Sequence, residues 1–261
     1  MKRLFRLERV FIKQYFKQLM EYKADFITGL IGFSLTQGLS LLFIGVLMSK
    51  IPSLHGWILS QIYFIYGFAL IPRGIDHLLT DNLWAVGQRL VYKGDFDKYM
   101  TRPMNPLLHV MMEVFQLDAL GELIIGIALL ITSSASVDWT ATKLLLFIVS
   151  IPFATLIYTA IKIAASSVAF WLKQSNSVTY LVYSMNNFTQ YPLTIFNRGV
   201  RFIVSFIIPF AFTAYYPAHY FLTGNNPLFN IGGLIVVSII AMILALLLWN
   251  RGIQAYESAG S

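Results

Sequence analysis

Three ionisable residues lie beside or within long apolar runs, and their types give the chain its clearest capacity for chemistry. Asp118 and Glu122 flank the start of the apolar run 119–137, and Lys162 lies near the end of the run 143–163. An ionisable side chain in such a run is a functional hypothesis by default, because charge is costly in an apolar medium. The turn between the runs is centred near residue 140. Asp118 and Lys162 are therefore about equally far along the two arms, and one interpretation is a charge pair that shifts when the arms move.

Two other interpretations of these residues stay open. Lys162 can extend its ammonium group to a polar interface while the carboxylates stay in water, an arrangement that needs no function. A proton relay is a further alternative, although the sequence shows no second buried acid–base step to receive the proton. The sequence also leaves open whether Asp118 or Glu122 is the partner of Lys162.

Aromatic side chains gather in the segment 191–221, which includes Tyr191, Phe206, Phe210 and Tyr215. A belt of aromatic rings at a membrane surface explains such a cluster. The same rings would suit an outward-facing cavity for lipophilic or cationic substrates, through apolar contact and cation–π attraction. The sequence leaves both interpretations open.

Several kinds of catalytic site have no sequence support. The pattern G-x-x-x-x-G-K-[ST] does not occur, so the chain has no P-loop for the phosphates of ATP, and neither H-E-x-x-H nor G-x-S-x-G is present. The chain has no cysteine, which excludes disulfides and thiolate sites. The four histidines are scattered. We expect no catalytic residue, no metal site and no cofactor in this chain.

The composition is that of a membrane protein. Hydrophobic residues make up 57% of the 261-residue chain and charged residues only 12%, about half the charged fraction of a soluble domain. Several runs reach the roughly 20 apolar residues that a helix needs to cross a bilayer. They are continuous, whereas the strands of a membrane barrel would alternate. The sequence predicts an all-α integral membrane protein.

Six membrane spans and one interfacial helix are expected. Residues 2–22 place apolar side chains at spacings of three and four with basic side chains between them, which predicts an amphipathic helix at the membrane surface within 1–24. The spans are expected at about 25–48, 57–79, 119–137, 143–163, 175–195 and 229–250. Short turns join the first two spans and the next two, so each pair forms a hairpin.

The basic residues predict the orientation. Thirteen Lys and Arg fall in the N-terminal 24 residues, the segment 80–112 and the two later segments on the same face, against four on the other face. By the positive-inside rule, both termini and the 80–112 segment are cytoplasmic. The same rule explains the net charge of +7 without nucleic acid. We expect a multi-pass protein of the cell membrane.

The region 175–217 contains two apolar runs, of which only one can span if the termini share a side. Pro192, Pro209 and Pro217 interrupt these runs. A re-entrant segment buried in protein tolerates a broken helix where lipid would not. The fifth span is placed at 175–195 and an outward-facing re-entrant segment at 199–222, while which run crosses stays open.

The polar segment 80–112 separates the two hairpins. Leu83, Val86 and Leu90 repeat at helical spacing, which predicts a short amphipathic helix over 81–92. Gly94 ends this helix, and Pro103 and Pro106 stiffen the chain beyond it. A solvated loop needs no such pattern. The segment is therefore interpreted as a docking element for a soluble partner.

These features together resemble those of an ABC-2-type exporter permease. The segment GDFDKYMTRPMNP (94–106) is similar to the G-x-x-D-x-x-L-x-R-P-x-N-P loop of one branch of that family, with Met100 in place of Leu. YPLTIF (191–196), IIPFAF (207–212) and YYPA (215–218) are similar to a later signature of the branch. The resemblance extends over essentially the whole chain.

The resemblance implies a permease subunit of an ATP-driven exporter. A separate ATPase subunit, in two copies, would bind ATP and Mg, and a second permease chain, identical or related, would complete a dimer. The implied location is the bacterial inner membrane, and multidrug efflux of small lipophilic or cationic cargo is an analogy only. The residues implied in coupling to the ATPase are Asp81, Leu83, Trp84, Val86, Gly87, Leu90, Gly94, Asp97, Arg102 and Pro103.

The alternative is a self-sufficient secondary transporter. It would predict ion sites at the midplane and broken helices repeated in corresponding halves. Only the late segment is broken here, and the charges lie near one face. The chain is expected to form one domain, divided into the interfacial helix 1–24, a first hairpin 25–79, the coupling region 80–112, a second hairpin 113–173, the fifth span to sixth span 174–250 and a cytoplasmic tail 251–261.

Overall fold

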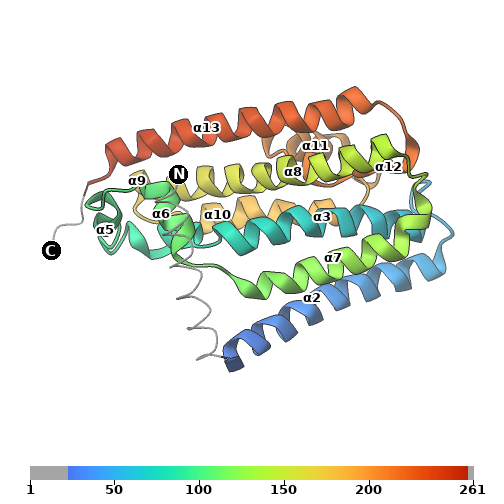
Figure 1. The fold of residues 1–261 in the computed structure, drawn as a ribbon, viewed down its shortest axis with the longest axis horizontal. Coiled ribbons are helices and arrows are strands. Elements are labelled where there is room, and N and C mark those ends of the chain that lie inside the picture. The colour runs from blue at the N-terminus through green and yellow to red at the C-terminus, as the bar shows by residue number, and fades with distance from the viewer. Residues whose placement is uncertain (1–22, 258–261) are drawn as a thin grey trace.

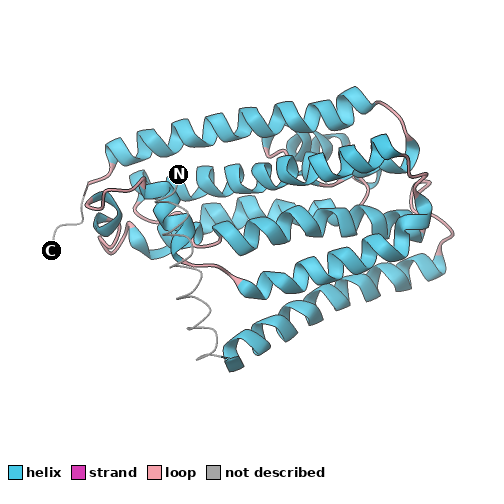
Figure 2. Ribbon diagram, in the orientation of Figure 1, coloured by secondary structure: helices cyan, strands magenta, loops and turns pink. Residues whose placement is uncertain are grey.

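The computed structural model describes residues 23–257, so most of the expected interfacial helix 1–24 lies outside the described residues. The described chain is helical, without a β-strand (Figures 1 and 2). Four of its segments are long and apolar enough to cross a membrane: Ile27–Lys50, Leu117–Ser136, Ala141–Leu172 and Leu228–Ala255. The helical structure and these four segments confirm the prediction of an all-α membrane protein, but not the number of six spans.

The long helices run side by side (Figure 1). They are α2 (Lys23–Lys50), α3 (Leu59–Thr80), α7 (Leu120–Ser133), α8 (Ala141–Ser167) and α13 (Gly233–Ala255). Helix α3 packs against α7 and α8, α8 packs against α13, and α2 lies at the edge beside α7. Helix α3 differs from the others because more than half of its residues are buried. Its central place lets it carry polar side chains that lipid would not tolerate.

Two glycines permit the close contact between α3 and α7. A Cβ atom on Gly67 would lie 3.2 Å from the carbonyl oxygen of Gly126, and a Cβ atom on Gly126 would lie 2.9 Å from the Cβ of Leu70. Small residues at a helix interface let the backbones approach where no larger residue fits. The pair Gly67–Gly126 therefore fixes the separation of these two helices.

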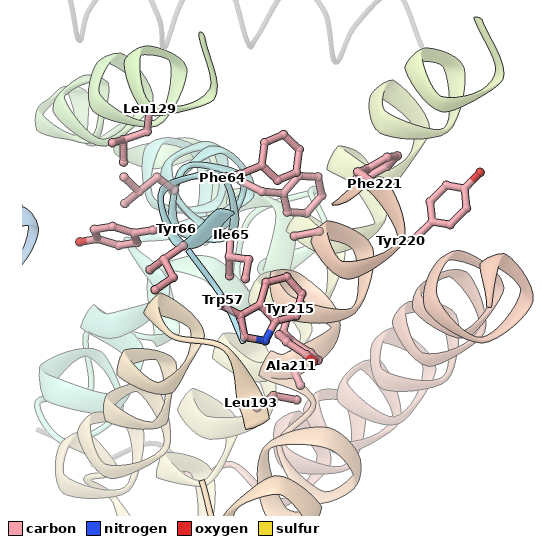
Figure 3. Packing of buried hydrophobic residues seen from close by; sticks show 14 of the residues in the cluster. Trp57, Phe64, Ile65, Tyr66, Leu129, Leu193, Ala211, Tyr215, Tyr220 and Phe221 are labelled. Carbon is pink, nitrogen blue, oxygen red and sulfur yellow. The ribbon is translucent and has the colours of Figure 1, made fainter. Parts of the chain in front are cut away.

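Aromatic residues fill the core near the α2–α3 turn. Figure 3 shows Trp57, Phe64, Tyr215 and Phe221 in one cluster with aliphatic neighbours. Trp57 meets Tyr215 edge-on with ring centroids 6.0 Å apart, a favourable geometry for two ring quadrupoles. This cluster ties α12 (Tyr215–Thr223) to the start of α3.

The region 176–223 is broken into short pieces. Helix α10 (Asn176–Ser184) continues as a 3-10 turn (Met185–Gln190), and a second 3-10 turn (Leu193–Ile195) follows Pro192. After it come α11 (Arg198–Phe202), a π-helical turn (Ile203–Ile207), a 3-10 turn (Phe210–Thr213) and α12. The α-helical part is shorter than the predicted span 175–195. The re-entrant assignment of 199–222 stays a prediction.

The segments after α3 form a second core at the other end of the bundle, where α5, α6 and α9 lie in Figure 1. Here α4 (Leu83–Ala85), a π-helical turn η1 (Val86–Leu90), α5 (Asp97–Met100) and α6 (Pro106–Glu113) pack against α9 (Ala169–Leu172) and the end of α13. A short helix was predicted at this place. The structure divides it into one α-helical and one π-helical turn.

Candidate functional site

The last turns of α3 carry a stripe of polar side chains. Arg73, Asp76, His77, Thr80 and Asp81 recur at spacings of three and four, so they lie along one side of the helix. They lie within a helix that is otherwise apolar and buried. A buried charge is tolerated only when it is paired and hydrogen-bonded, and each residue of the stripe has such partners on α3 itself, α7, α8 or α10.

Lys162 on α8 is the cation at the centre of one half of this network. Its Nζ lies 2.8 Å from Asp76 Oδ2 and 2.8 Å from Asp81 Oδ1, and it donates to Thr80 Oγ1 at 3.2 Å. The three protons of the ammonium group thus have three acceptors. The side chain is fully buried. Removing one partner of such a pair costs about 3–5 kcal/mol, because the other charge stays buried alone.

Asp76 is saturated with hydrogen bonds. Its Oδ1 accepts from Thr80 Oγ1 at 2.6 Å and from Thr159 Oγ1 at 2.8 Å. Its Oδ2 accepts from Tyr183 Oη at 2.9 Å and from Lys162. This carboxylate links α3, α8 and α10, so it holds three helices at a fixed register.

Glu122 on α7 is the anion of the other half. Arg73 Nε donates to its Oε2 at 2.7 Å, and His77 Nδ1 lies 3.1 Å from its Oε1. The guanidinium of Arg73 also lies over the ring of Phe33 on α2, 5.8 Å from the centroid. The ring of His77 joins the two halves, because its Nε2 lies 3.6 Å from Asp81 Oδ2.

The predicted pair between Asp118 and Lys162 is wrong, and Glu122 is not the partner of Lys162 either. Lys162 pairs across the bundle with α3 instead. Asp118 lies on a 3-10 turn, Leu117–Ala119, beside Gly29 of α2. The prediction considered only the two arms of one hairpin, whereas each arm pairs with the polar stripe of α3, a helix of the other hairpin.

A cavity of about 400 Å³ opens beside the network. It has the size of a small-molecule site. Aromatic rings and polar groups both line it, from α2, α3, α4, α7 and α10. The lining includes Arg73, His77, Asp81, Trp84, Glu122, Tyr180 and Tyr183. Within residues 23–257, no group of three or more His, Asp or Glu is arranged to hold a metal ion.

The four aromatic residues expected to line an outward cavity do not come together. Phe210 is buried against Tyr158 and Tyr183, and Tyr215 packs in the Trp57 cluster. Phe206 is exposed beside a separate apolar groove between α8 and α13. Tyr191 is half-buried at the edge of the Trp57 cluster. The expectation of a common cavity for these four residues is corrected.

The expected coupling segment presents a different face from the one predicted. Leu83, Val86, Gly87 and Leu90 are buried in the second core, so these side chains anchor the segment instead of contacting a partner. Between residues 81 and 93, the exposed side chains are those of Gln88, Arg89, Tyr92 and Lys93. Trp84 and Asp81 are half-buried and line the cavity.

Polar contacts hold the stretch 94–113 in place, both within the stretch and to Tyr256 near the C-terminus. Tyr256 Oη donates to Asp97 Oδ1 at 2.8 Å, and Lys98 Nζ lies 2.9 Å from Glu113 Oε1. Arg102 Nη1 lies 3.0 Å from Nε2 of buried His109. Gly94 has a positive φ of 76°, a conformation that favours glycine. Arg102 and Pro103 are exposed.

Ionisation in this stretch follows from burial and neighbouring charges. Burial lowers the pKa of His109, and the guanidinium of Arg102 lowers it further. Burial raises the pKa of Glu113, but hydrogen bonds from Tyr99 and Lys98 outweigh it, and the net pKa lies below its ordinary value. Near neutral pH, His109 therefore favours the neutral imidazole, and Glu113 favours the charged carboxylate.

Sequence reasoning missed six members of the network: Arg73, Asp76, His77, Thr80, Thr159 and Tyr183. The signal was present in IPRGIDHLLT (71–80), where three ionisable residues fall inside an expected span. Such residues mark functional sites in membrane helices and face the protein interior. Their spacing of three and four predicts that they share one face of a helix. Their partners on α7, α8 and α10 are determined by helix packing, which the sequence pattern does not show.

Comparison with characterised proteins and with solved structures returned no match. Residues 34–260 match the family model described as ABC-2 family transporter protein. The match includes every residue of the buried charge network and every helix from α3 to α13. A polar, charge-lined cavity inside an apolar helical bundle agrees with a transport component. The chain therefore belongs to the ABC-2 family of transporter proteins.

Proposed function

We propose that the chain is the permease subunit of an ATP-driven exporter, working as a dimer with a second permease chain. A separate ATPase chain would bind ATP and Mg, since this sequence contains no P-loop. The proposed topology has six spans, with α3 and α10 as the second and fifth, both termini in the cytoplasm, and 199–222 re-entrant from outside. Membership in the ABC-2 family supports the assignment of the chain as a permease subunit.

One observation carries the proposal: the segment expected to dock on the ATPase is continuous with the charge network. Asp81 is the C-cap of α3 and receives Lys162, and α4 begins two residues later at Leu83. On its far side, the carbonyl oxygen of Gly87 accepts from the backbone N–H of Ser175 at 2.9 Å. A push on η1 is therefore transmitted to α3 and to the start of α10, and both helices line the cavity.

The proposed docking surface is the exposed face of 88–93 together with the exposed residues 100–103. It carries Arg89, Lys93 and Arg102, so an acidic groove on the ATPase would match it in charge. Complementary charge of this kind affects association rate and partner choice more than the total binding energy. The buried side chains of η1 supply the rigid support that such a surface needs.

The test is purification of the tagged chain from its native membrane in mild detergent, with mass spectrometry of the proteins that accompany it. A P-loop ATPase in stoichiometric amount is expected. The double variant Arg89→Glu/Lys93→Glu should lose most of this ATPase. The control is Lys50→Glu, at the C-terminal end of α2, which should retain the ATPase. Retention of the ATPase by the double variant would contradict the docking surface.

The same purification addresses the alternative of a secondary transporter. The buried Lys162–Asp76 pair is the kind of intramembrane ion pair that a secondary transporter uses, which favours that alternative over other functions. A chain that purifies alone and still moves solute into liposomes without ATP would establish it. ATP-dependent transport that requires the copurified ATPase would exclude it.

A further inference from the structure

An exposed strip runs along α11 and the π-helical turn that follows it, Ile203–Ile207. Arg198, Phe202 and Phe206 recur at intervals of four residues, so they lie on one side of this segment. All three are exposed, as is Arg201 beside them. The rings of Phe202 and Phe206 lie together, with centroids 5.6 Å apart. The strip is therefore basic at its start and apolar at its end.

The basic end of the strip lies beside the Trp57 cluster. Val200, between the two arginines, packs against this cluster, which lies near the α2–α3 turn. Arg201 Nε donates to the carbonyl oxygen of Phe196 at 2.8 Å, which orients the guanidinium and leaves its charge in place. Within residues 23–257, neither arginine forms an ion pair with a carboxylate. Two cations are therefore available to an anion from outside the chain.

The membrane side of these cations points to the kind of anion. Under the proposed topology they lie on the outer side, where the positive-inside rule disfavours Lys and Arg. Arg198 and Arg201 therefore need a role other than orienting the chain. Lipid phosphates lie at this depth, and guanidinium groups bind phosphate oxygens through paired hydrogen bonds.

The apolar end of the strip reaches a groove of about 320 Å³ between α8 and α13. Phe206 and Ile207 form one wall of this groove. Both helices belong to segments long and apolar enough to cross a membrane, and Leu244, which lines the groove on α13, is 61% exposed. The hydroxyl of Ser205, which also lines it, is already hydrogen-bonded to Tyr216 at 2.9 Å. The groove therefore opens toward hydrocarbon and suits an apolar occupant.

A single alkyl chain fits this groove. Alanines at intervals of four leave the space along both helices: Ala160 and Ala164 on α8, and Ala241 and Ala245 on α13. A helix with its side chains is about 10–12 Å across, so a groove of about 320 Å³ does not admit a second helix. An extended alkyl chain is much thinner. The basic end and the groove together match one molecule that carries both a phosphate and an acyl chain.

We propose that this surface binds one anionic phospholipid, with its phosphate beside Arg198 and Arg201 and one acyl chain in the groove. The exposed rings of Phe202 and Phe206 lie along the path between the two parts. A headgroup with a net negative charge is favoured over a zwitterionic one, because two guanidinium groups attract the extra charge. The lipid is a structural ligand that holds α11 against the bundle, and not a cargo. The site is separate from the cavity beside the charge network and goes beyond the proposed function.

The test is native mass spectrometry of the purified full chain in detergent, titrated with dioleoylphosphatidylglycerol or dioleoylphosphatidylcholine. The first lipid is anionic and the second is zwitterionic. The natural chain should hold one tightly bound phosphatidylglycerol that the double variant Arg198→Gln/Arg201→Gln binds about tenfold more weakly. Phosphatidylcholine should bind both forms alike. The control is Lys50→Gln, which removes an exposed positive charge at the end of α2 and should bind phosphatidylglycerol as the natural chain does.

Two further variants test the groove. Ala241→Phe and Ala164→Phe fill it from α13 and from α8, and each should weaken the binding of both lipids about tenfold, because the acyl chain loses its place. Ala128→Phe, at an exposed position on α7 away from the groove, is the matched control and should bind both lipids normally. A melting curve of each variant establishes that it is folded, and two groove variants on different helices guard against the failure of one.

Any of three results would overturn the proposal. They are equal phosphatidylglycerol binding by the natural chain and the arginine double variant, full lipid binding by both groove variants, and dissociation of a dimer by the arginine double variant without any change in lipid binding. The last result would assign the strip to a second copy of the chain. The titration uses neither ATP nor an ATPase, so loss of the ATPase in the purification described above removes the exporter function and leaves the lipid site standing.

Discussion

Lys162 Nζ and Asp76 Oδ2 lie 2.8 Å apart, and neither side chain has any exposed surface. This pair joins α8 to α3 in the middle of the charge network. In a bilayer, neither group has water as an alternative partner, so the two residues depend on each other. Helices that belong to different predicted hairpins are thereby held at one register.

Lys162→Met should destabilise the chain by about 3–5 kcal/mol, because Asp76 and Asp81 would then be buried without their cation. The double variant Lys162→Met/Asp76→Asn should recover part of this loss, since the most deeply buried negative charge is also removed. Thermal unfolding in detergent measures both. Lys50→Met, at an exposed position at the end of α2, is the control and should change stability by less than about 0.5 kcal/mol.

Gly126→Ala should destabilise the α3–α7 contact by about 1–3 kcal/mol, the usual cost of overpacking. The new Cβ would lie 2.9 Å from the Cβ of Leu70 and 3.2 Å from the carbonyl oxygen of Gly67, and the backbone cannot move aside cheaply. Gly32→Ala is the matched control, because no atom lies within 4 Å of its added Cβ. There, alanine should stabilise the helix by about 0.5–1 kcal/mol. Equal melting shifts for the two variants would contradict the close-packing argument.

Long apolar runs made the main helices predictable from sequence. The structure starts α3 at Leu59 and α8 at Ala141, both within two residues of the predicted spans 57–79 and 143–163. These helices depend on composition and length, which are local properties. The span predicted at 175–195 stays a prediction, because its α-helix ends at Ser184 and continues as a 3-10 turn to Gln190. The position of this break depends on packing against other helices, which a sequence pattern does not show.

The coupling segment shows a second limit of sequence reasoning. The apolar spacing of Leu83, Val86 and Leu90 correctly indicated an amphipathic element, but not what covers its apolar face. That face meets Phe170 and Trp249 of the same chain in the second core. An amphipathic pattern has the same form whether the partner is internal or external. Leu90→Asp should therefore impair folding of the chain, and not docking alone, which a melting curve beside the ATPase purification would distinguish.

The 97–113 stretch should loosen as the pH falls through the range in which His109 is protonated. The pKa of His109 is lowered in the folded chain by burial and by Arg102. A lowered folded pKa means that the stability contribution is present above the ordinary histidine pKa of about 6.5 and is lost as the pH falls through the folded value. Protonation also places an imidazolium beside the Arg102 guanidinium, 3.0 Å away.

Hydrogen exchange of the 97–113 amides at pH 7.5 and pH 5 measures this loosening. Faster opening at the lower pH is expected in the natural chain, after correction for the intrinsic pH dependence of exchange. His109→Phe, which keeps an aromatic ring beside Tyr99, should lose the effect. Because Glu113 also has a lowered pKa, a second loosening is expected only at more acidic pH, where that carboxylate gains a proton. An unchanged pattern in His109→Phe would assign the first loosening to another group.

The proposed topology predicts opposite labelling of two single cysteines. The natural chain has no cysteine, so each introduced thiol is the sole target of a membrane-impermeant maleimide. Asn225→Cys, in the exposed turn between α12 and the start of the last long helical segment, should be labelled in intact cells. Lys93→Cys, exposed at the opposite end beside η1, should be labelled only after permeabilisation. The reverse pattern would place the basic docking surface outside the cell, out of reach of any ATPase. Labelling of both sites in intact cells would contradict the odd number of spans proposed between Lys93 and Asn225.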